Sequence, residues 1–270
     1  MAAAAAKAGA LKVYILGRRE DRLSAAVDSL QGEGVIVPVV CDVTSQESID
    51  SAVTFIEKDS AYIDVLINNA GRARPFYDPA AAKTIEELRD GLLEAHLHTQ
   101  DVLQTNTGRI IGASSSFLPL LHKGNVKRGW SDSKLSEHAL NKQQIATSDV
   151  RTSQIITVSS ISGFERHWLT GLAYSASNAA ATHLGKVLAT MLVPWNIRSN
   201  VIVPGLYPSE MTAFLSKDEI RISNTPAGRA DSVEDVAGII LYLMDRGGAY
   251  VNGSTMITDG GRLSIEASSY

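Results

Sequence analysis

A serine pair and a tyrosine are the residues of this chain whose spacing best suits joint chemistry. Ser159 and Ser160 end an apolar run, and Tyr174 follows fourteen residues after Ser160. At the carboxyl edge of a sheet, the hydroxyls of Ser160 and Tyr174 could hold the oxygen of a carbonyl or an alcohol, with tyrosine as proton donor or acceptor. A free tyrosine has a pKa of about 10, so it needs a nearby cation to work near neutral pH.

Two further segments place small or polar residues after apolar runs. Asp42 follows one run, where its carboxylate could accept a hydrogen bond from an amino group or simply begin a helix. The sequence "NNAG" (68–71) follows another, where its small residues would let the backbone approach a flat ligand or make an ordinary turn. Neither segment decides the function alone.

The elements that must position these residues alternate between strand and helix patterns. The apolar strands show no alternation of polar residues, which predicts a parallel sheet covered on both faces and an α/β, Rossmann-like, doubly wound fold. Ligands in such folds bind at the carboxyl ends of the strands. The predicted strands are 12–17, 34–40, 63–68, 153–160, 197–205 and 254–261, and the clearest helices are 19–31, 101–121, 174–193 and 233–244. Capping boxes are predicted at Thr44–Glu47, Thr84–Glu87 and Ser232–Asp235.

Composition limits the classes of function. The 270 residues suit one domain (1–270), and a net charge of −4 offers no basic face to nucleic acid or to an anionic membrane. The single cysteine, Cys41, is expected to be a buried core thiol, and no segment is long and apolar enough to span a bilayer. The histidines show no metal-ligand spacing, so no metal is predicted. We expect a cytoplasmic protein.

Residues 123–152 form a long, mostly polar insertion between a helix and the fourth strand. Structureless loops of this length are uncommon in compact domains. Two accounts remain open: a surface loop particular to this protein, or a gene-model error such as a retained intron.

Four ordered motifs together resemble the short-chain dehydrogenases/reductases. They are "DVT" (42–44), "NNAG" (68–71), "SSISG…YSAS" (159–177) and "SNVIVPG" (199–205). The likeness covers nearly the whole chain apart from the insertion, and the second half resembles the fungal members that accompany secondary metabolism. The resemblance implies a carbonyl or alcohol substrate, a nicotinamide cofactor, and homo-oligomers formed through the long helices at 101–121 and 174–193.

The resemblance also assigns roles by position. Ser160 would orient the substrate oxygen, Tyr174 would be the acid/base, and Asn106 would hold a proton-relay water. Asn178 occupies the position of a lysine that lowers the pKa of the tyrosine. The residues implied to contact the cofactor, besides Tyr174, are Asp42, Val43, Asn69, Ala70, Gly71, Pro204, Gly205, Leu206 and Ser209. His167 and Trp168 would line the substrate entrance or lie on a surface loop.

The chain departs from the family pattern at its start. It resembles the family from the middle of the first helix onward, without the first strand and the Gly-rich turn that seats a pyrophosphate. That strand is central in the family's sheet, so without it the strands 12–17 and 63–68 have unpaired inner edges unless these edges pair with each other or with another segment. We expect stability and cofactor affinity to suffer.

Arg18 and Arg19 follow strand 12–17, where NAD-preferring members of the family carry an acid. Guanidinium groups there suit a 2′-phosphate, so NADP is the predicted cofactor, although two solvated arginines would also suit a helix start. Three hypotheses follow: an NADP(H)-dependent oxidoreductase interconverting a ketone and a secondary alcohol of a secondary metabolite, a catalytically impaired or inactive pseudoenzyme, and a non-redox enzyme that cyclises or dehydrates.

Overall fold

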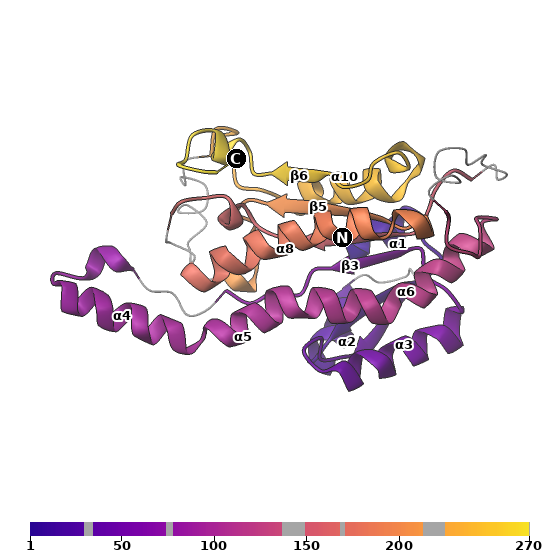
Figure 1. Ribbon diagram of the computed structural model, residues 1–270, viewed down its shortest axis with the longest axis horizontal. Helices are drawn as coiled ribbons and strands as arrows, with labels where there is room; N and C mark the ends of the chain where they lie inside the picture. The colour runs from indigo at the N-terminus through magenta and orange to yellow at the C-terminus, as the bar shows by residue number, and fades with distance from the viewer. Residues whose placement is uncertain (30–34, 74–77, 137–148, 168–170, 213–224, 270) are drawn as a thin grey trace.

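The computed structural model describes residues 1–29, 35–73, 78–136, 149–167, 171–212 and 225–269 (Figure 1). The centre of the 123–152 insertion, the end of the predicted helix 19–31 and Trp168 lie outside these ranges.

The six predicted strands all form, and every pairing between them is parallel. They are arranged as a two-stranded sheet, β1–β2, and a four-stranded sheet in the order β3–β4–β5–β6. No ladder joins β1 to β3 in the described part of the chain. The strands are β1 (Val13–Gly17), β2 (Ile36–Val40), β3 (Val65–Asn68), β4 (Gln154–Val158), β5 (Arg198–Pro204) and β6 (Thr255–Thr258).

The helices cover the strands as a doubly wound fold requires (Figure 1). The predicted helix 101–121 is longer than expected, because α6 continues to Lys127. The first residues of the predicted insertion are therefore the last turn of a helix. The helices are α1 (Ala2–Lys7), α2 (Glu20–Ser29), α3 (Gln46–Ser60), α4 (Ile85–Leu97), α5 (Thr99–Leu103), α6 (Arg109–Lys127), α8 (Leu172–Met191) and α10 (Val233–Met244).

The predicted helix caps have different outcomes. The Thr84 hydroxyl caps α4 by accepting the Glu87 N–H at 3.1 Å, and a capping box between Ser232 and Asp235 starts α10. The predicted Thr44–Glu47 box is wrong. The N-cap of α3 is Ser45, whose side chain accepts the Ser48 N–H, and Thr44 instead donates to Asp42.

The core of the four-stranded sheet is apolar on both faces. Ile155 belongs to a cluster with α6 and α8, which includes Ile110, Leu121 and Leu188. The next residue, Ile156, belongs to a cluster on the other face with Ile202 and with Ile240 and Leu243 of α10. Alternating residues of one strand therefore support both helix layers.

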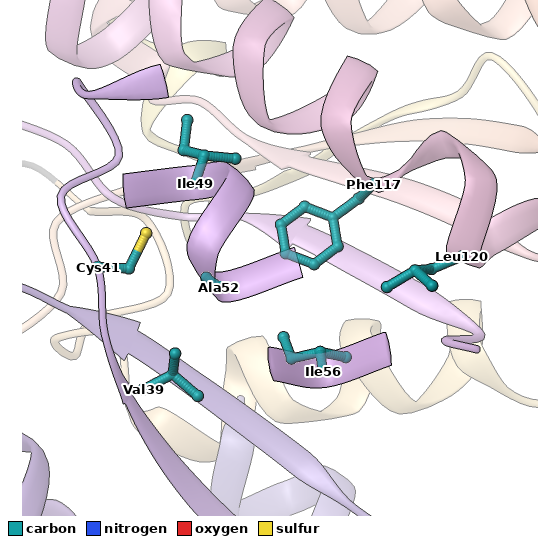
Figure 2. Packing of buried hydrophobic residues seen from close by; sticks show 7 residues of the cluster. All are labelled: Val39, Cys41, Ile49, Ala52, Ile56, Phe117 and Leu120. Atoms are coloured by element: carbon teal, nitrogen blue, oxygen red, sulfur yellow. The ribbon is translucent and has the colours of Figure 1, made fainter. Parts of the chain in front are cut away.

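The region between the two sheets is held by helices. Figure 2 shows the cluster that joins β2 and α3 to α6, formed by Val39, Cys41, Ile49, Ala52, Ile56, Phe117 and Leu120. Cys41 is a free, buried thiol, as predicted. On the other side, α1 contacts both β1 and α10. Side-chain packing, rather than strand pairing, thus connects β1–β2 to the rest of the fold.

The insertion begins and ends at the edge of the sheet opposite the carboxyl ends of the strands. Arg128 follows α6 and forms an ion pair with Asp64, which directly precedes β3. The Trp130 Nε1–H donates to the backbone oxygen of Arg151 at 3.1 Å, which ties the two ends of the insertion together. These described ends lie away from Ser160 and Tyr174.

Candidate active site

Ser160 is held at the end of β4 by contacts with α8. It is the N-cap of a 3₁₀ turn (Ile161–Gly163), and its Oγ accepts the Ser162 N–H at 3.2 Å. The preceding Ser159 Oγ donates to the backbone oxygen of Asn178 at 2.8 Å. Gly163 lies so close to α8 that a Cβ there would be 2.7 Å from the Ala179 nitrogen. The turn can approach the helix because this residue has no side chain.

Ser160 and Tyr174 meet as the sequence predicts. Side-chain hydrogen bonds with Ser160 and Asn178 lower the pKa of Tyr174, but burial raises it more, so the net shift is upward from its ordinary value of 10.0. The Tyr174 hydroxyl is therefore protonated at neutral pH. This arrangement can donate a proton to an oxygen held at Ser160, but it provides little tyrosinate to accept one.

Asn178 lies on α8 one turn after Tyr174 and is 5% exposed. Its Nδ2 donates to the Tyr174 backbone oxygen at 3.0 Å. None of the described cationic side chains shifts the pKa of Tyr174. Lys186, the next lysine along α8, is exposed. The structure thus provides no substitute for the missing positive charge within the ranges it describes.

Asn106 is buried in a π-helical turn (Gln104–Gly108) between α5 and α6. Such turns are rare and often mark functional sites. Its Oδ1 accepts the Arg72 N–H at 2.7 Å, and its Nδ2 donates to the Arg72 oxygen and to the Ser177 Oγ, both at 2.9 Å. Both amide hydrogens are committed to protein acceptors, so the side chain fastens the segment after β3 to α8.

The residues expected along the cofactor lie at the carboxyl ends of β2 and β3. Asp42 accepts from the backbone and the hydroxyl of Thr44, which lower its pKa, and is therefore also the anchor of a local turn. Val43 packs against the cluster of Figure 2. Asn69, Ala70 and Gly71 are exposed.

The two arginines after β1 have different surroundings. Arg18 is exposed and is close enough to Asp42 to lower the pKa of that carboxyl. Arg19 donates from Nη2 to Glu210 at 3.0 Å, and Arg22 also forms an ion pair with Glu210. Glu210 comes from the segment after β5, so this ion pair joins the end of the two-stranded sheet to the end of the four-stranded one.

Pro204 ends β5, Gly205 and Leu206 follow it, and all three are half-buried. A Cβ on Gly205 would be 2.7 Å from the Asp231 Oδ2 and 2.8 Å from the Asp259 Cα, so only glycine fits there. Burial and neighbouring carboxylates raise the pKa of Asp231 to about 6. Ser209 is exposed, and its N–H donates to the Thr212 Oγ1 at 2.8 Å, which shapes the loop.

The C-terminal segment supports the serine turn, which sequence reasoning did not foresee. Arg262 forms an ion pair with the buried Glu165, five residues after Ser160, at 3.2 Å. The Ser269 N–H donates to the Phe164 oxygen at 2.8 Å. Sequence spacing gives no signal for these contacts, because the partners lie about a hundred residues apart. His167 is exposed nearby.

The described residues contain neither a metal-binding cluster nor a membrane-spanning helix. No group of three or more histidine, cysteine, aspartate or glutamate side chains could hold a metal ion. No described helix has the length and apolar character needed to cross a membrane.

Known proteins resemble this chain over almost its full length. Residues 81–262 match the family described as Enoyl-(Acyl carrier protein) reductase, and residues 1–126 match the short chain dehydrogenase family. The short-chain dehydrogenase/reductase PhomF of Diaporthe leptostromiformis is 38% identical over 96% of this chain and 85% of its own length. SAT3 of Stachybotrys chartarum, which bears the same description, is 36% identical over 97% of each chain.

Solved structures share the fold. The Pseudomonas aeruginosa RhlG/NADP active-site complex superposes with a TM-score of 0.74 at 24% identity, covering 97% of this chain and 89% of that one. An actinorhodin polyketide ketoreductase with NADPH gives a TM-score of 0.73 at 25% identity, covering 97% and 90%. With two matching families, fungal relatives above 30% identity and this fold, the chain belongs to the short-chain dehydrogenase/reductase family of oxidoreductases.

Proposed function

We propose that this protein is an NADPH-dependent reductase that converts a ketone of a secondary metabolite to the secondary alcohol. The observation that carries the proposal is the contact of Ser160 with a half-buried, protonated Tyr174 at the carboxyl edge of the sheet. The likeness to a polyketide ketoreductase with NADPH supports the ketone and the cofactor. The secondary metabolite follows from the resemblance of the second half of the chain to fungal members of the family that accompany secondary metabolism, and the relatives named above are fungal.

The residues of the site perform the proton half of the reaction. The Ser160 hydroxyl donates a hydrogen bond to the carbonyl oxygen and orients it, and Tyr174 transfers its phenolic proton to the same oxygen as the carbonyl carbon is reduced. Bound NADPH supplies the hydride that this carbon receives. Because burial holds the pKa of Tyr174 above its ordinary value, the tyrosine hydroxyl is protonated at neutral pH. The site therefore favours reduction over oxidation.

The residues present fit an NADP-type cofactor in part. The Arg18 guanidinium makes no hydrogen bond or ion pair with any described residue, which leaves it able to bind a 2′-phosphate. Asn69, Ala70 and Gly71 are exposed at the same edge, and Gly205 allows close approach beside Asp231. Arg19 differs, because Glu210 already neutralises it.

The test is turnover of a panel of polyketide-type ketones with NADPH by the purified chain, Tyr174→Phe and Ser160→Ala. The wild type should oxidise NADPH and form alcohol, and removing the tyrosine hydroxyl should lower kcat on the order of 10²–10⁴-fold. Failure of the wild type to bind NADPH or reduce any ketone, or equal turnover by Tyr174→Phe, would overturn the proposal. Product that still forms without nicotinamide would identify the non-redox alternative.

Two observations favour a second candidate, a protein of this family with impaired catalysis. Asn178 gives Tyr174 no positive charge, and strand pairing does not unite the two sheets in the described ranges. Asn178→Lys together with an added N-terminal strand and Gly-rich turn distinguishes the two. Activity that only this variant shows would support impairment, whereas activity of the unaltered chain would exclude it.

Exposed apolar side chains on two long helices support self-association. Ile111 of α6 is 56% exposed, and Val187 and Met191 of α8 are 43% and 54% exposed. We propose that a second copy of the chain covers these residues. Sedimentation of the wild type and of a Val187→Ser, Met191→Ser variant tests this, since the variant should shift toward monomer.

A further inference from the structure

Arg109, the first residue of α6, is a buried cation without a partner among the described residues. It is 4% exposed, and its Nε has no hydrogen-bond acceptor. The guanidinium forms no ion pair with any residue in the described ranges, and burial alone lowers its pKa to about 10. A buried charge without a partner is costly to the fold, so such groups commonly bind a ligand or another charge.

Arg198 is a second buried arginine of this protein, and its guanidinium, unlike that of Arg109, has hydrogen-bond acceptors. It is 7% exposed and its pKa is also lowered to about 10. However, its Nη1 donates to the backbone oxygens of Gly248 and Val251 at 2.9 and 2.8 Å, and its Nε donates to Thr152 at 3.2 Å. Burial alone therefore does not explain why Arg109 has no partner.

The position of Arg109 on α6 is fixed by contacts on either side of it. Asn106, three residues earlier, binds the backbone of Arg72. Ser114, five residues later, accepts a hydrogen bond from Asn68, the last residue of β3. Arg109 therefore lies level with residues 69–71, just beyond the carboxyl end of β3.

The same helix geometry gives the direction that Arg109 faces. Gly112, three residues later and hence on the same side of the helix, faces α3, because a Cβ there would be 3.3 Å from the Gln46 Oε1 and 3.7 Å from the Ile49 Cδ1. This side of α6 therefore faces the first turn of α3, which follows the carboxyl end of β2.

We propose that Arg109 binds a phosphate-class anion at the carboxyl ends of β2 and β3, namely the diphosphate of the nicotinamide cofactor. A guanidinium presents a planar fork of donors that matches phosphate oxygens, and desolvation strengthens such charge-assisted bonds. Arg109 would in this way perform the anion binding that a Gly-rich turn performs elsewhere. The proposal rests on the proposed function for the identity of the ligand, but the anion site itself does not.

The experiment measures the affinity for inorganic pyrophosphate and for NADPH, by titration calorimetry and by thermal melting, in the wild type, Arg109→Gln, Arg109→Lys and Arg198→Gln. Arg109→Gln should bind pyrophosphate about 10- to 100-fold more weakly, the range expected for hydrogen bonds to a charged group. Its melting temperature without ligand should equal or exceed that of the wild type, because an uncompensated charge is removed. Arg198→Gln, the control, should melt lower and keep its affinity for pyrophosphate.

The outcomes separate this inference from the proposed function. Equal pyrophosphate affinity in the wild type and Arg109→Gln, or no binding by the wild type, overturns the anion site. If Arg109→Gln loses pyrophosphate binding while the wild type binds pyrophosphate but not NADPH, the anion site stands and the proposed function fails. If NADPH binds equally to both, the function stands and the role of Arg109 fails. If Arg109→Gln does not fold, the Arg109→Lys variant provides the test. A lysine lacks the planar fork of donors of a guanidinium, so this variant should bind pyrophosphate several-fold more weakly than the wild type. An unchanged affinity for pyrophosphate overturns the anion site.

Discussion

The β1–β2 half and the four-stranded half of this molecule obtain their stability in different ways. In β4 and β5 almost every residue is buried, because each strand is paired on both sides and covered on both faces. In β1 every residue is only half-buried. The second half carries Ser160 and Tyr174, and the first carries Arg18 and Arg19. The comparison indicates that strand pairing fixes the half with the proposed catalytic residues, whereas the half with the arginines proposed for the cofactor depends on side-chain packing.

The largest expected effect comes from breaking the packing that joins the halves. Phe117 of α6 lies between them in the cluster of Figure 2 and is 3% exposed. Phe117→Ala should lower the free energy of unfolding by about 3–5 kcal/mol. Urea denaturation measures the loss, and limited proteolysis should then cut within residues 12–45 first. A loss below about 1 kcal/mol would mean that the halves are joined in some other way.

Adding a positive charge beside Tyr174 should increase the rate of alcohol oxidation relative to that of ketone reduction. Asn178→Lys should lower the pKa of the tyrosine, and each unit of lowering gives about tenfold more tyrosinate below that pKa. Alcohol oxidation at neutral pH should therefore rise on the order of 10- to 100-fold, with its pH profile moved to lower pH. Asn178→Gln is the uncharged control. An unchanged pH profile in the lysine variant would show that Tyr174 does not carry the proton.

The raised pKa of Asp231 predicts how the loop after β5 responds to pH. Its folded pKa of about 6 exceeds the unfolded value of 3.8, so its contribution to stability is complete below pH 4 and is lost as pH rises through 6. Asp231→Asn removes this loss. The variant should be more stable than the wild type at pH 7 by about 1 kcal/mol, after allowance for partial solvent screening, and should not differ near pH 4. Urea denaturation at both values checks this, and an equal gain at pH 4 would contradict it.

The smallest effect is expected at the ion pair that links the two halves across the carboxyl edge. Glu210→Gln frees Arg19, so affinity for NADPH should rise less than about fivefold because the pair is exposed to solvent. Glu47→Gln, on the exposed face of α3, is the matched control. Fluorescence titration measures both. A weaker affinity in the Glu210 variant would indicate that Glu210 itself contacts the cofactor.

Sequence reasoning succeeded where local signals decide the structure. Apolar runs located all six strands, and spacing placed Ser160 and Tyr174 in contact. Sequence reasoning failed where contacts between residues distant in the sequence determine the structure. The end of α6 at Lys127 and the partner of Arg19 depend on residues distant in sequence. The sequence does contain one indication of the buried Arg109, namely a charged residue within the apolar pattern of the helix that becomes α6.

Hydrogen exchange with and without NADPH tests the central comparison most directly. We predict that amides of β1 and β2 exchange faster than those of β4 and β5 in the free chain, because local opening follows weak packing. NADPH should slow exchange in β1 and β2 and leave β4 and β5 almost unchanged. Equal protection of all four strands in the free chain, or no slowing of β1 and β2 with saturating NADPH, would contradict the account.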